Sequence, residues 1–251
     1  MSVRLKTEKE VDAMRKAGKI LASVFDLIAD HVKPGVSAKE LDDLIHKTIV
    51  EANAKPSFYG YRGFKYASCI SKNEEVVHGI PHADKIMLEG DICSIDIGVH
   101  YSGYHADAAR TFAVGHINNE AKRLIDVTRE SFFEAIKEAL PGKYLGDIAA
   151  AMQYHVEKAG FGVVRDLCSH GIGRDLHEEP LIPNFGKRGQ GMRLKAGMTF
   201  AIEPMVTQGT FEVLTLPDKW TIITADKKWA AHYENTIHIG KTGAEILTLL
   251  A

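Results

Sequence analysis

Apolar residues recur with helical spacing in two parts of the chain, and the segment after each part alternates apolar and polar residues as strands do. In the first half, Thr7–Glu10 matches a capping box that opens a helix, and Pro34-Gly35 breaks that helix. A second capping box, Ser37–Glu40, opens another helix, and from about Tyr66 to Val114 the pattern becomes that of strands. The first half therefore predicts two helices followed by several strands.

The second half repeats this order of elements. Helix is predicted from about 119 to 140, breaks at Pro141-Gly142, resumes, and gives way to strands. The two Pro-Gly breaks lie 107 positions apart, and the same offset aligns "EGDICSID" with "AGMTFAIE", two strands that each end in an acid. Short strings also match by chance, but here the offset is constant. We therefore expect one domain, 1–251, whose pseudo-symmetric halves, roughly 1–115 and 116–251, share one sheet.

The composition is that of an ordinary globular protein. The 251 residues are 45% hydrophobic and 25% charged, with a formal net charge of −2, so no basic excess predicts a specific nucleic-acid partner. No apolar run is long enough to cross a bilayer, and Met1–Glu10 lacks the core of a signal peptide. Cys69, Cys93 and Cys168 form no CxxC pair, which argues against a disulfide framework or a structural zinc site. We expect a cytoplasmic protein that does not enter membranes.

The stretch "DIGVHYSGYHADAARTF" predicts a β-hairpin with an acid in each arm. Ser102-Gly103 suits a two-residue turn, which pairs Asp96 with Ala109 and puts Asp107 one diagonal away on the same face. Two converging carboxylates repel each other unless something positive lies between them. A salt bridge to Arg110 is the plainer interpretation, but strand alternation turns Arg110 to the other face. A bound cation is the alternative.

Three further segments carry residues of the same chemistry. "CSHGIGRDLHEEP" contains His170 and His177, "TFAIEPM" contains Glu203 before a proline, and "AAHYENTIHI" contains Glu234. One imidazole and four carboxylates carry too much negative charge for one divalent ion, whereas two ions balance it. Oxygen ligands favour Mn²⁺, Fe²⁺ or Co²⁺, and the imidazole keeps Zn²⁺ open. Each residue alone also has a plainer explanation, such as a solvated glutamate or a histidine that caps a turn. Four other histidines are expected to be structural or to lie behind the ligands: His100, His105, His232 and His238.

The blocks "SKNEEVVHGIP", "DIGVHYSGYHADAARTF", "HGIGRDLHEEP", "TFAIEPMV" and "YENTIHI", in this order, resemble the signature blocks of methionine aminopeptidases. Only 33 positions separate His170 from Glu203, which leaves no room for the long helical insertion of type II enzymes. The chain therefore resembles the short bacterial type I form. The resemblance implies an α+β "pita-bread" fold with a pseudo-twofold axis, in which helices cover a central antiparallel sheet. It also implies a hydrolase that removes N-terminal methionine when the second residue is small.

Carried over position by position, the resemblance assigns a metal centre. Two divalent ions (Co²⁺, Mn²⁺, Fe²⁺ or Zn²⁺) would be held by five ligands: Asp96, Asp107, His170, Glu203 and Glu234. Of these, Asp107 and Glu234 would bridge the two ions. A water between the ions would be the nucleophile, with Glu203 as its general base and later proton donor.

The resemblance also assigns the residues that bind the substrate. His78 and His177 would hydrogen-bond the scissile amide and stabilise the oxyanion. The pocket for the methionine side chain would be lined by four residues: Tyr61, Phe64, Cys69 and Trp220. The partners it implies are peptides and nascent chains, it leaves a transient contact with the ribosome open, and we expect a monomer.

The sequence departs from the family pattern at two positions. Ser169 stands where the family usually has glycine, and Leu176 where phenylalanine is common, which leaves the selectivity of the pocket open.

Two other functions are possible for such a sequence. One alternative is a related exopeptidase that cleaves before proline, but those enzymes carry an additional N-terminal domain for which Asp96 lies too early. The other is a binding protein that kept the fold and lost its metals.

Overall fold

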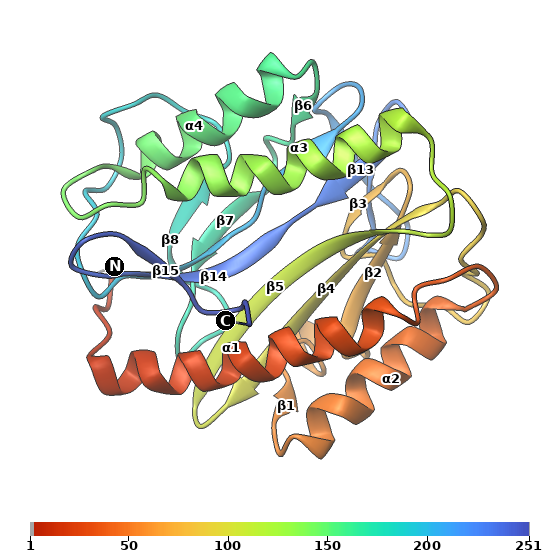
Figure 1. Cartoon of the computed structure of the whole chain (residues 1–251), viewed down its shortest axis with the longest axis horizontal. Helices are drawn as coiled ribbons and strands as arrows, with labels where there is room; N and C mark the ends of the chain where they lie inside the picture. Colours follow the sequence, from red (N-terminus) through yellow and green to blue (C-terminus); the bar gives the residue numbers. More distant parts are fainter. Residues whose placement is uncertain (1–2, 251) are drawn as a thin grey trace.

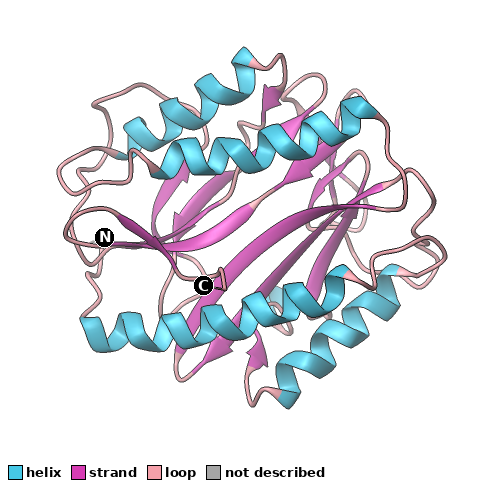
Figure 2. Cartoon of the chain, viewed as in Figure 1, coloured by secondary structure: helices cyan, strands magenta, loops and turns pink. Residues whose placement is uncertain are grey.

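The computed structural model describes residues 3–250, so residues 1, 2 and 251 of the expected domain lie outside it. The described part is an α+β structure with helices over a largely antiparallel sheet (Figures 1 and 2). Its helices are α1 (Glu8–Ala29), α2 (Ala38–Glu51), the short 3-10 helix η1 (Tyr61–Gly63), α3 (Asn119–Ile136) and α4 (Leu145–Lys158). None of these helices is long and apolar enough to cross a membrane.

Both predicted capping boxes form at the starts of the first two helices. The backbone N–H of Thr7 donates to Glu10 Oε2 at 2.8 Å, which satisfies a donor that the helix itself leaves free. At α2 the backbone N–H of Ser37 donates to Glu40 Oε2 at 2.8 Å, and the backbone N–H of Glu40 donates to Ser37 Oγ at 3.2 Å. Local sequence therefore determines where each of these helices begins.

The strands of the first half are β1 (Lys55–Pro56), β2 (Ser68–Lys72), β3 (Glu75–Val77), β4 (Ile92–Tyr101) and β5 (Tyr104–Ala113). Those of the second half are β6 (Gly162–Val163), β7 (Cys168–Gly171), β8 (Glu178–Pro183), β9 (Thr199–Ile202), β10 (Met205–Thr207), β11 (Val213–Thr215), β12 (Ile222–Thr224), β13 (Ala230–His232), β14 (Glu234–Ile239) and β15 (Ala244–Ile246).

One nine-stranded sheet joins the two halves. Its strands run in the order β1-β4-β5-β14-β9-β7-β8, with β2 beside β4 and β15 beside β14. The halves meet where β5 pairs with β14, and Glu234 lies opposite Ala109 there. In Figure 1 the pair α1 and α2 and the pair α3 and α4 both lie in front of the sheet, so the helices cover one of its faces. The predicted fold, a pseudo-twofold sheet covered by helices, is confirmed.

The repeat is visible in the hydrogen bonds as well as in the sequence. The backbone N–H of Gly35 donates to the carbonyl of Met87 at 2.8 Å, and that of Gly142 donates to the carbonyl of Leu194 at 2.9 Å. Both partners of the second bond stand 107 positions after those of the first. The two glycines also share a left-handed backbone, with φ of 91° and 93°, which glycine adopts without a steric penalty. The same turn therefore precedes the second helix of each half.

The predicted hairpin forms with the predicted register. Ser102 and Gly103 have positive φ, 51° and 82°, as a two-residue hairpin turn of this kind requires, and Asp96 pairs with Ala109. One detail of the repeat was wrong. Asp96 does not end its strand, because β4 continues to pair with β5 as far as Tyr101, whereas β9 does end directly before Glu203.

Strand alternation decides which face carries the acids. Ile95 and Ile97 of β4 and Ala106 and Ala108 of β5 belong to the buried core that contains the apolar side chains of α1 and α2. Asp96 and Asp107 have the opposite parity, so they point to the face away from the helices. This face holds the site.

Candidate active site

A cavity of about 150 Å³ opens on the face of the sheet away from the helices. It brings together all the residues that the sequence and the resemblance put forward, from both halves of the chain. Its lining includes Tyr61, Phe64, Cys69, His78, Asp96, Asp107, His170, His177, Glu203, Trp220 and Glu234.

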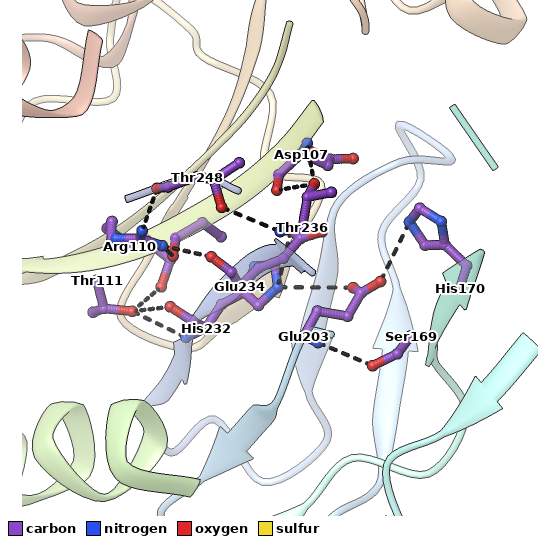
Figure 3. A network of polar contacts seen from close by, with 12 residues as sticks. Asp107, Arg110, Thr111, Ser169, His170, Glu203, His232, Glu234, Thr236 and Thr248 are labelled. Atoms are coloured by element: carbon purple, nitrogen blue, oxygen red, sulfur yellow. Dashed lines mark hydrogen bonds and ion pairs between the residues drawn. The ribbon is translucent and has the colours of Figure 1, made fainter. Parts of the chain in front are cut away.

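The backbone of Glu203 is held by hydrogen bonds at both its N–H and its carbonyl group. Its backbone N–H donates to Ser169 Oγ at 2.9 Å, and its carbonyl accepts a hydrogen bond from Asn184 Nδ2 at 2.9 Å. Its carboxylate lies between two imidazoles, with Oε1 at 3.5 Å from His170 Nε2 and Oε2 at 3.7 Å from His232 Nε2 (Figure 3). The backbone contacts fix residue 203 where Pro204 stops the strand, and they aim its carboxylate into the cavity.

Glu234 begins β14 at the seam between the two halves. Its backbone carbonyl accepts a hydrogen bond from Arg110 Nη1 at 2.5 Å (Figure 3). Arg110 lies over the rings of Phe25 and Tyr233 and makes no ion pair with Asp107 among the described residues. The prediction that Arg110 faces away from the acids is therefore confirmed, and the salt-bridge interpretation of the hairpin was wrong.

Three histidines of the lining come from loops and strand ends. His170 Nδ1 lies 2.8 Å from the carbonyl oxygen of Gly171, which favours the tautomer with its proton on Nδ1 and leaves Nε2 free to bind a metal. The ring of His177 lies 4.2 Å from that of His170 and stacks on Tyr61 at 5.2 Å. His78 has a left-handed backbone, φ 58°, which is uncommon outside glycine and frequent at functional sites.

Burial dominates the electrostatics of the site. It raises the pKa of Asp96 to about 7. Burial also holds the pKa values of Asp107, Glu203 and Glu234 well above their usual range, and repulsion from neighbouring carboxylates raises these three further. Burial lowers the pKa of His170 to about 3 and that of His78 to about 4, so both imidazoles are neutral at pH 7. The protein alone therefore does not compensate four charged carboxylates here.

Unpartnered atoms in the cluster fit a metal. Asp96 Oδ1, Asp107 Oδ1 and Glu234 Oε1 are buried and have no hydrogen-bond partner within the described residues. Atoms of Asp107, His170 and Glu234 lie within 4.8 Å of one another, as ligands of one ion do. Since buried polar atoms are rarely left unpaired, and these are carboxylate oxygens beside a neutral imidazole, the donor set suits divalent cations.

The apolar part of the cavity is aromatic. The rings of Phe64 and Trp220 meet edge to face with centroids 5.0 Å apart, and Tyr61 lies on the side of His177. Burial raises the pKa of the Cys69 thiol, so this side chain stays neutral and acts as a small apolar wall. Leu176 also lines the cavity, at the position where the family often has phenylalanine.

Sequence reasoning missed two residues of the cavity lining. Phe58 and Arg62 line the cavity beside Tyr61, and the cluster of aromatic residues between them was the available signal. His232 was expected to be structural or to lie behind the ligands, and its Nε2 lies 3.9 Å from Glu234 Oε2. In an extended segment, a spacing of two residues turns both side chains to the same side, which predicts this approach.

Comparisons with known proteins agree with the fold and the site. Residues 12–241 match metallopeptidase family M24. The chain is 51% identical over 246 residues to a methionine aminopeptidase of Clostridium perfringens (strain 13 / Type A), and the match covers 98% of each chain. The crystal structure of methionine aminopeptidase from Thermotoga maritima superposes with a TM-score of 0.98 at 46% identity, covering 99% of this chain and 100% of that one.

The fold and the buried carboxylate–histidine cluster thus define a metallopeptidase of the pita-bread type. The chain belongs to metallopeptidase family M24 and, within it, to the short bacterial type I methionine aminopeptidases. The prolidase of Pyrococcus furiosus shares only the fold, with a TM-score of 0.79 at 23% identity, and this chain covers 66% of it. Membership of an enzyme family confirms the expectation of a hydrolase over a binding protein without activity.

Proposed function

We propose that the buried cluster holds two divalent metal ions and that the protein hydrolyses the bond after an N-terminal methionine when the second residue is small. Removal of N-terminal methionine is the activity of the family to which the chain belongs. One observation carries the proposal for the site. Four carboxyl groups line one cavity, with Asp107 and Glu234 buried and the Glu203 side chain 14% exposed, and none of them forms an ion pair with a lysine or arginine in the described part of the chain.

The ligands come from both halves of the molecule. Asp96 and Asp107 project from the hairpin, His170 from β7 and Glu234 from the start of β14, and Glu203 directly follows β9. Asp107 and Glu234 come from β5 and β14, the two strands that pair at the seam between the halves, and both would help to hold the ions. When bound, divalent ions lower the pKa of water and polarise a carbonyl group.

Glu203 and two histidines perform the proton transfers and stabilise charge. Glu203 takes a proton from the attacking water and then gives it to the leaving amine, a role that suits a carboxylate with a raised pKa. His78 and His177 donate hydrogen bonds to the scissile amide and to the oxyanion that forms from it. Burial lowers the pKa of both imidazoles, so each donates as a neutral group.

The methionine side chain occupies the aromatic part of the cavity. Tyr61, Phe64, Cys69 and Trp220 offer a largely apolar surface that a flexible thioether fills well. The small cavity volume, about 150 Å³, supports a site for one terminal side chain rather than for the interior of a peptide. A small second residue is part of the proposal because it follows from the resemblance to the type I enzymes.

The proposed setting is a monomer of one domain that acts in the cytoplasm on peptides and nascent chains, with the ribosome as a transient partner. Cys69, Cys93 and Cys168 are all free thiols, and the first two are buried, which supports a reducing compartment.

The test is an assay of the protein after its metals are removed by chelation. We expect no release of methionine from a Met-Ala-Ser peptide until Co²⁺, Mn²⁺, Fe²⁺ or Zn²⁺ is added, and then no cleavage of an Ala-Pro peptide. Met-Lys-Ser is the matched peptide for the size limit and should be cleaved far more slowly. Equal turnover of Met-Ala-Ser and Met-Lys-Ser, or full activity without metal, contradicts the proposal.

A further inference from the structure

His232 faces the metal-site carboxylates from the side opposite His170, and the function proposed above gives it no role. Its side chain is 2% exposed, and its Nε2 lies 3.7 Å from Glu203 Oε2 and 3.9 Å from Glu234 Oε2. Within residues 3–250, Nε2 of His232 has no hydrogen-bond partner. A buried ring nitrogen without a partner costs free energy, so its position needs an explanation.

The distances fit ligands of one ion better than hydrogen bonds. Hydrogen bonds between nitrogen and oxygen usually measure about 2.7–3.2 Å, which is shorter than either contact of Nε2. Ligand atoms about 2.1 Å from one ion lie about 3.4 Å apart at a tetrahedral angle and further apart at wider angles. His170 Nε2, the predicted nitrogen ligand, lies 3.5 Å from Glu203 Oε1, so the two imidazoles approach Glu203 in similar ways. Atoms of Glu203, His232 and Glu234 also lie within 4.8 Å of one another.

The backbone holds His232 in this position. Thr111 Oγ1 accepts a hydrogen bond from the N–H of His232 at 2.9 Å and donates one to its carbonyl at 2.8 Å (Figure 3). On its other side, β13 pairs with β10, with His232 opposite Met205. Residue 232 is therefore fixed between two strands, and its side chain needs no reorganisation to reach the carboxylates.

We propose that His232 is a further protein ligand of the metal centre, a second nitrogen donor that shares an ion with Glu203 and Glu234. This inference rests on the proposed metal centre and adds to the five ligands predicted from the sequence. A second imidazole makes the ligand set softer, so the ion beside His232 is expected to be bound more selectively as Zn²⁺ or Co²⁺ than as Mn²⁺.

The number of imidazoles on metal tests the inference directly. Metal-free protein labelled with ¹⁵N-histidine is loaded with two equivalents of ¹¹³Cd²⁺, and each imidazole nitrogen bonded to cadmium shows a one-bond ¹¹³Cd–¹⁵N splitting by NMR. We expect two split imidazole signals in the unmodified protein, so this count needs no variant that folds. One split signal overturns the inference and leaves the metal centre standing. No split signal overturns the metal centre as well.

Variants assign the signals. His170→Gln and His232→Gln should each remove one split signal and leave the other. His232→Gln should also weaken cadmium binding by at least the roughly 10–100-fold typical of residues that support a ligand. The matched control is His238→Gln, because Nδ1 of this largely buried histidine faces Glu245 at 3.5 Å, outside the cavity. His238→Gln should keep both signals. Two signals that both persist in His232→Gln contradict the assignment.

Discussion

The hydroxyl oxygen of Ser169 accepts a hydrogen bond from the backbone N–H of Glu203 at 2.9 Å. The same hydroxyl donates to Asn184 Oδ1 at 2.8 Å, and Asn184 Nδ2 donates to the carbonyl of Glu203 at 2.9 Å. Ser169 and Asn184 are fully buried. At a position where the family usually has glycine, this chain therefore has a serine that helps to hold the proposed general base.

Ser169→Ala should reduce both stability and rate. The change leaves Asn184 Oδ1 and the N–H of Glu203 without their partner, which costs about 1–3 kcal/mol of the free energy of unfolding. It should also lower kcat with little change in metal content, because the ligand atoms remain. Urea unfolding, metal analysis and steady-state kinetics check this, with exposed Ser23→Ala in α1 as the control. A Ser169→Ala protein as stable and as fast as the unmodified one would show that these bonds do not matter.

His170→Ala and His177→Ala should fail in different ways. His170→Ala removes a proposed nitrogen ligand, so metal affinity and rate should both fall. Removal of His177 leaves the ligands untouched, so its ions should stay while kcat drops by roughly a hundredfold or more, the usual scale for one donor to an oxyanion. If His177 acts mainly in the transition state, kcat falls more than KM rises. Loss of the ions from His177→Ala, or a rate near that of the unmodified protein, contradicts the assignment.

Glu10 should make stability depend on pH at the acid end. Hydrogen bonds from the backbone of Thr7 and from the hydroxyl of Tyr104 lower its pKa from 4.5 to about 2. A carboxyl group whose pKa is lower in the folded state contributes stability above the unfolded pKa, and this is lost as pH falls through the folded pKa. Glu10→Gln should therefore be less stable than the unmodified protein at pH 7, and the difference should shrink between about pH 4.5 and 2. Urea unfolding of both proteins across this range measures it, and a difference independent of pH would refute the assignment.

The buried ion pair of Lys6 and Glu178 should support the loop that carries His177. Lys6 Nζ lies 2.5 Å from Glu178 Oε2, with the lysine side chain 2% exposed. Glu178 Oε1 also accepts the backbone N–H of Arg174 at 2.7 Å, so the pair ties the N-terminal segment to the loop. Lys6→Met leaves the Glu178 carboxylate, 15% exposed, without its charged partner, and we expect it to lower the free energy of unfolding by about 1.5–3 kcal/mol.

The double variant Lys6→Met/Glu178→Met distinguishes the energy of the ion pair from the effect of each side chain alone. It should recover part of the stability, because no buried charge is left alone. Chemical unfolding of the single and double variants gives the coupling between the two residues, and each protein should unfold in one transition if the chain is one domain. A double variant no more stable than Lys6→Met, or two separate transitions, goes against this interpretation.

Local signals predicted most of the fold, and contacts between distant segments supplied what the sequence did not reveal. The capping boxes at Thr7 and Ser37 and the turn at Ser102-Gly103 depend on neighbouring residues, so the sequence located them correctly. The repeat predicted a strand that ends at Asp96, whereas β4 continues to the turn at Ser102-Gly103, as the local hairpin signal predicted.

The site shows the same division. Strand parity predicted that Asp96 and Asp107 share a face, but the pairing of β14 with β5, which brings Glu234 beside them, has no local signal. The roles of the individual residues came from the resemblance to the family. It gives no role to Ser169, which replaces the family's usual glycine, or to His232, which is not among the residues that it assigns. Their contacts with Glu203 depend on how distant strands come together.

Anomalous diffraction from a crystal of the Mn²⁺-loaded protein tests the central claim most directly, because it counts and locates the ions in one measurement. We predict two manganese peaks inside the cavity between Asp107 and Glu234, and the loss of at least one of them in Asp107→Asn, whose amide keeps the shape of the side chain but cannot balance two cations. A single peak, or peaks outside the cavity in a protein that still releases methionine, would contradict the two-metal centre.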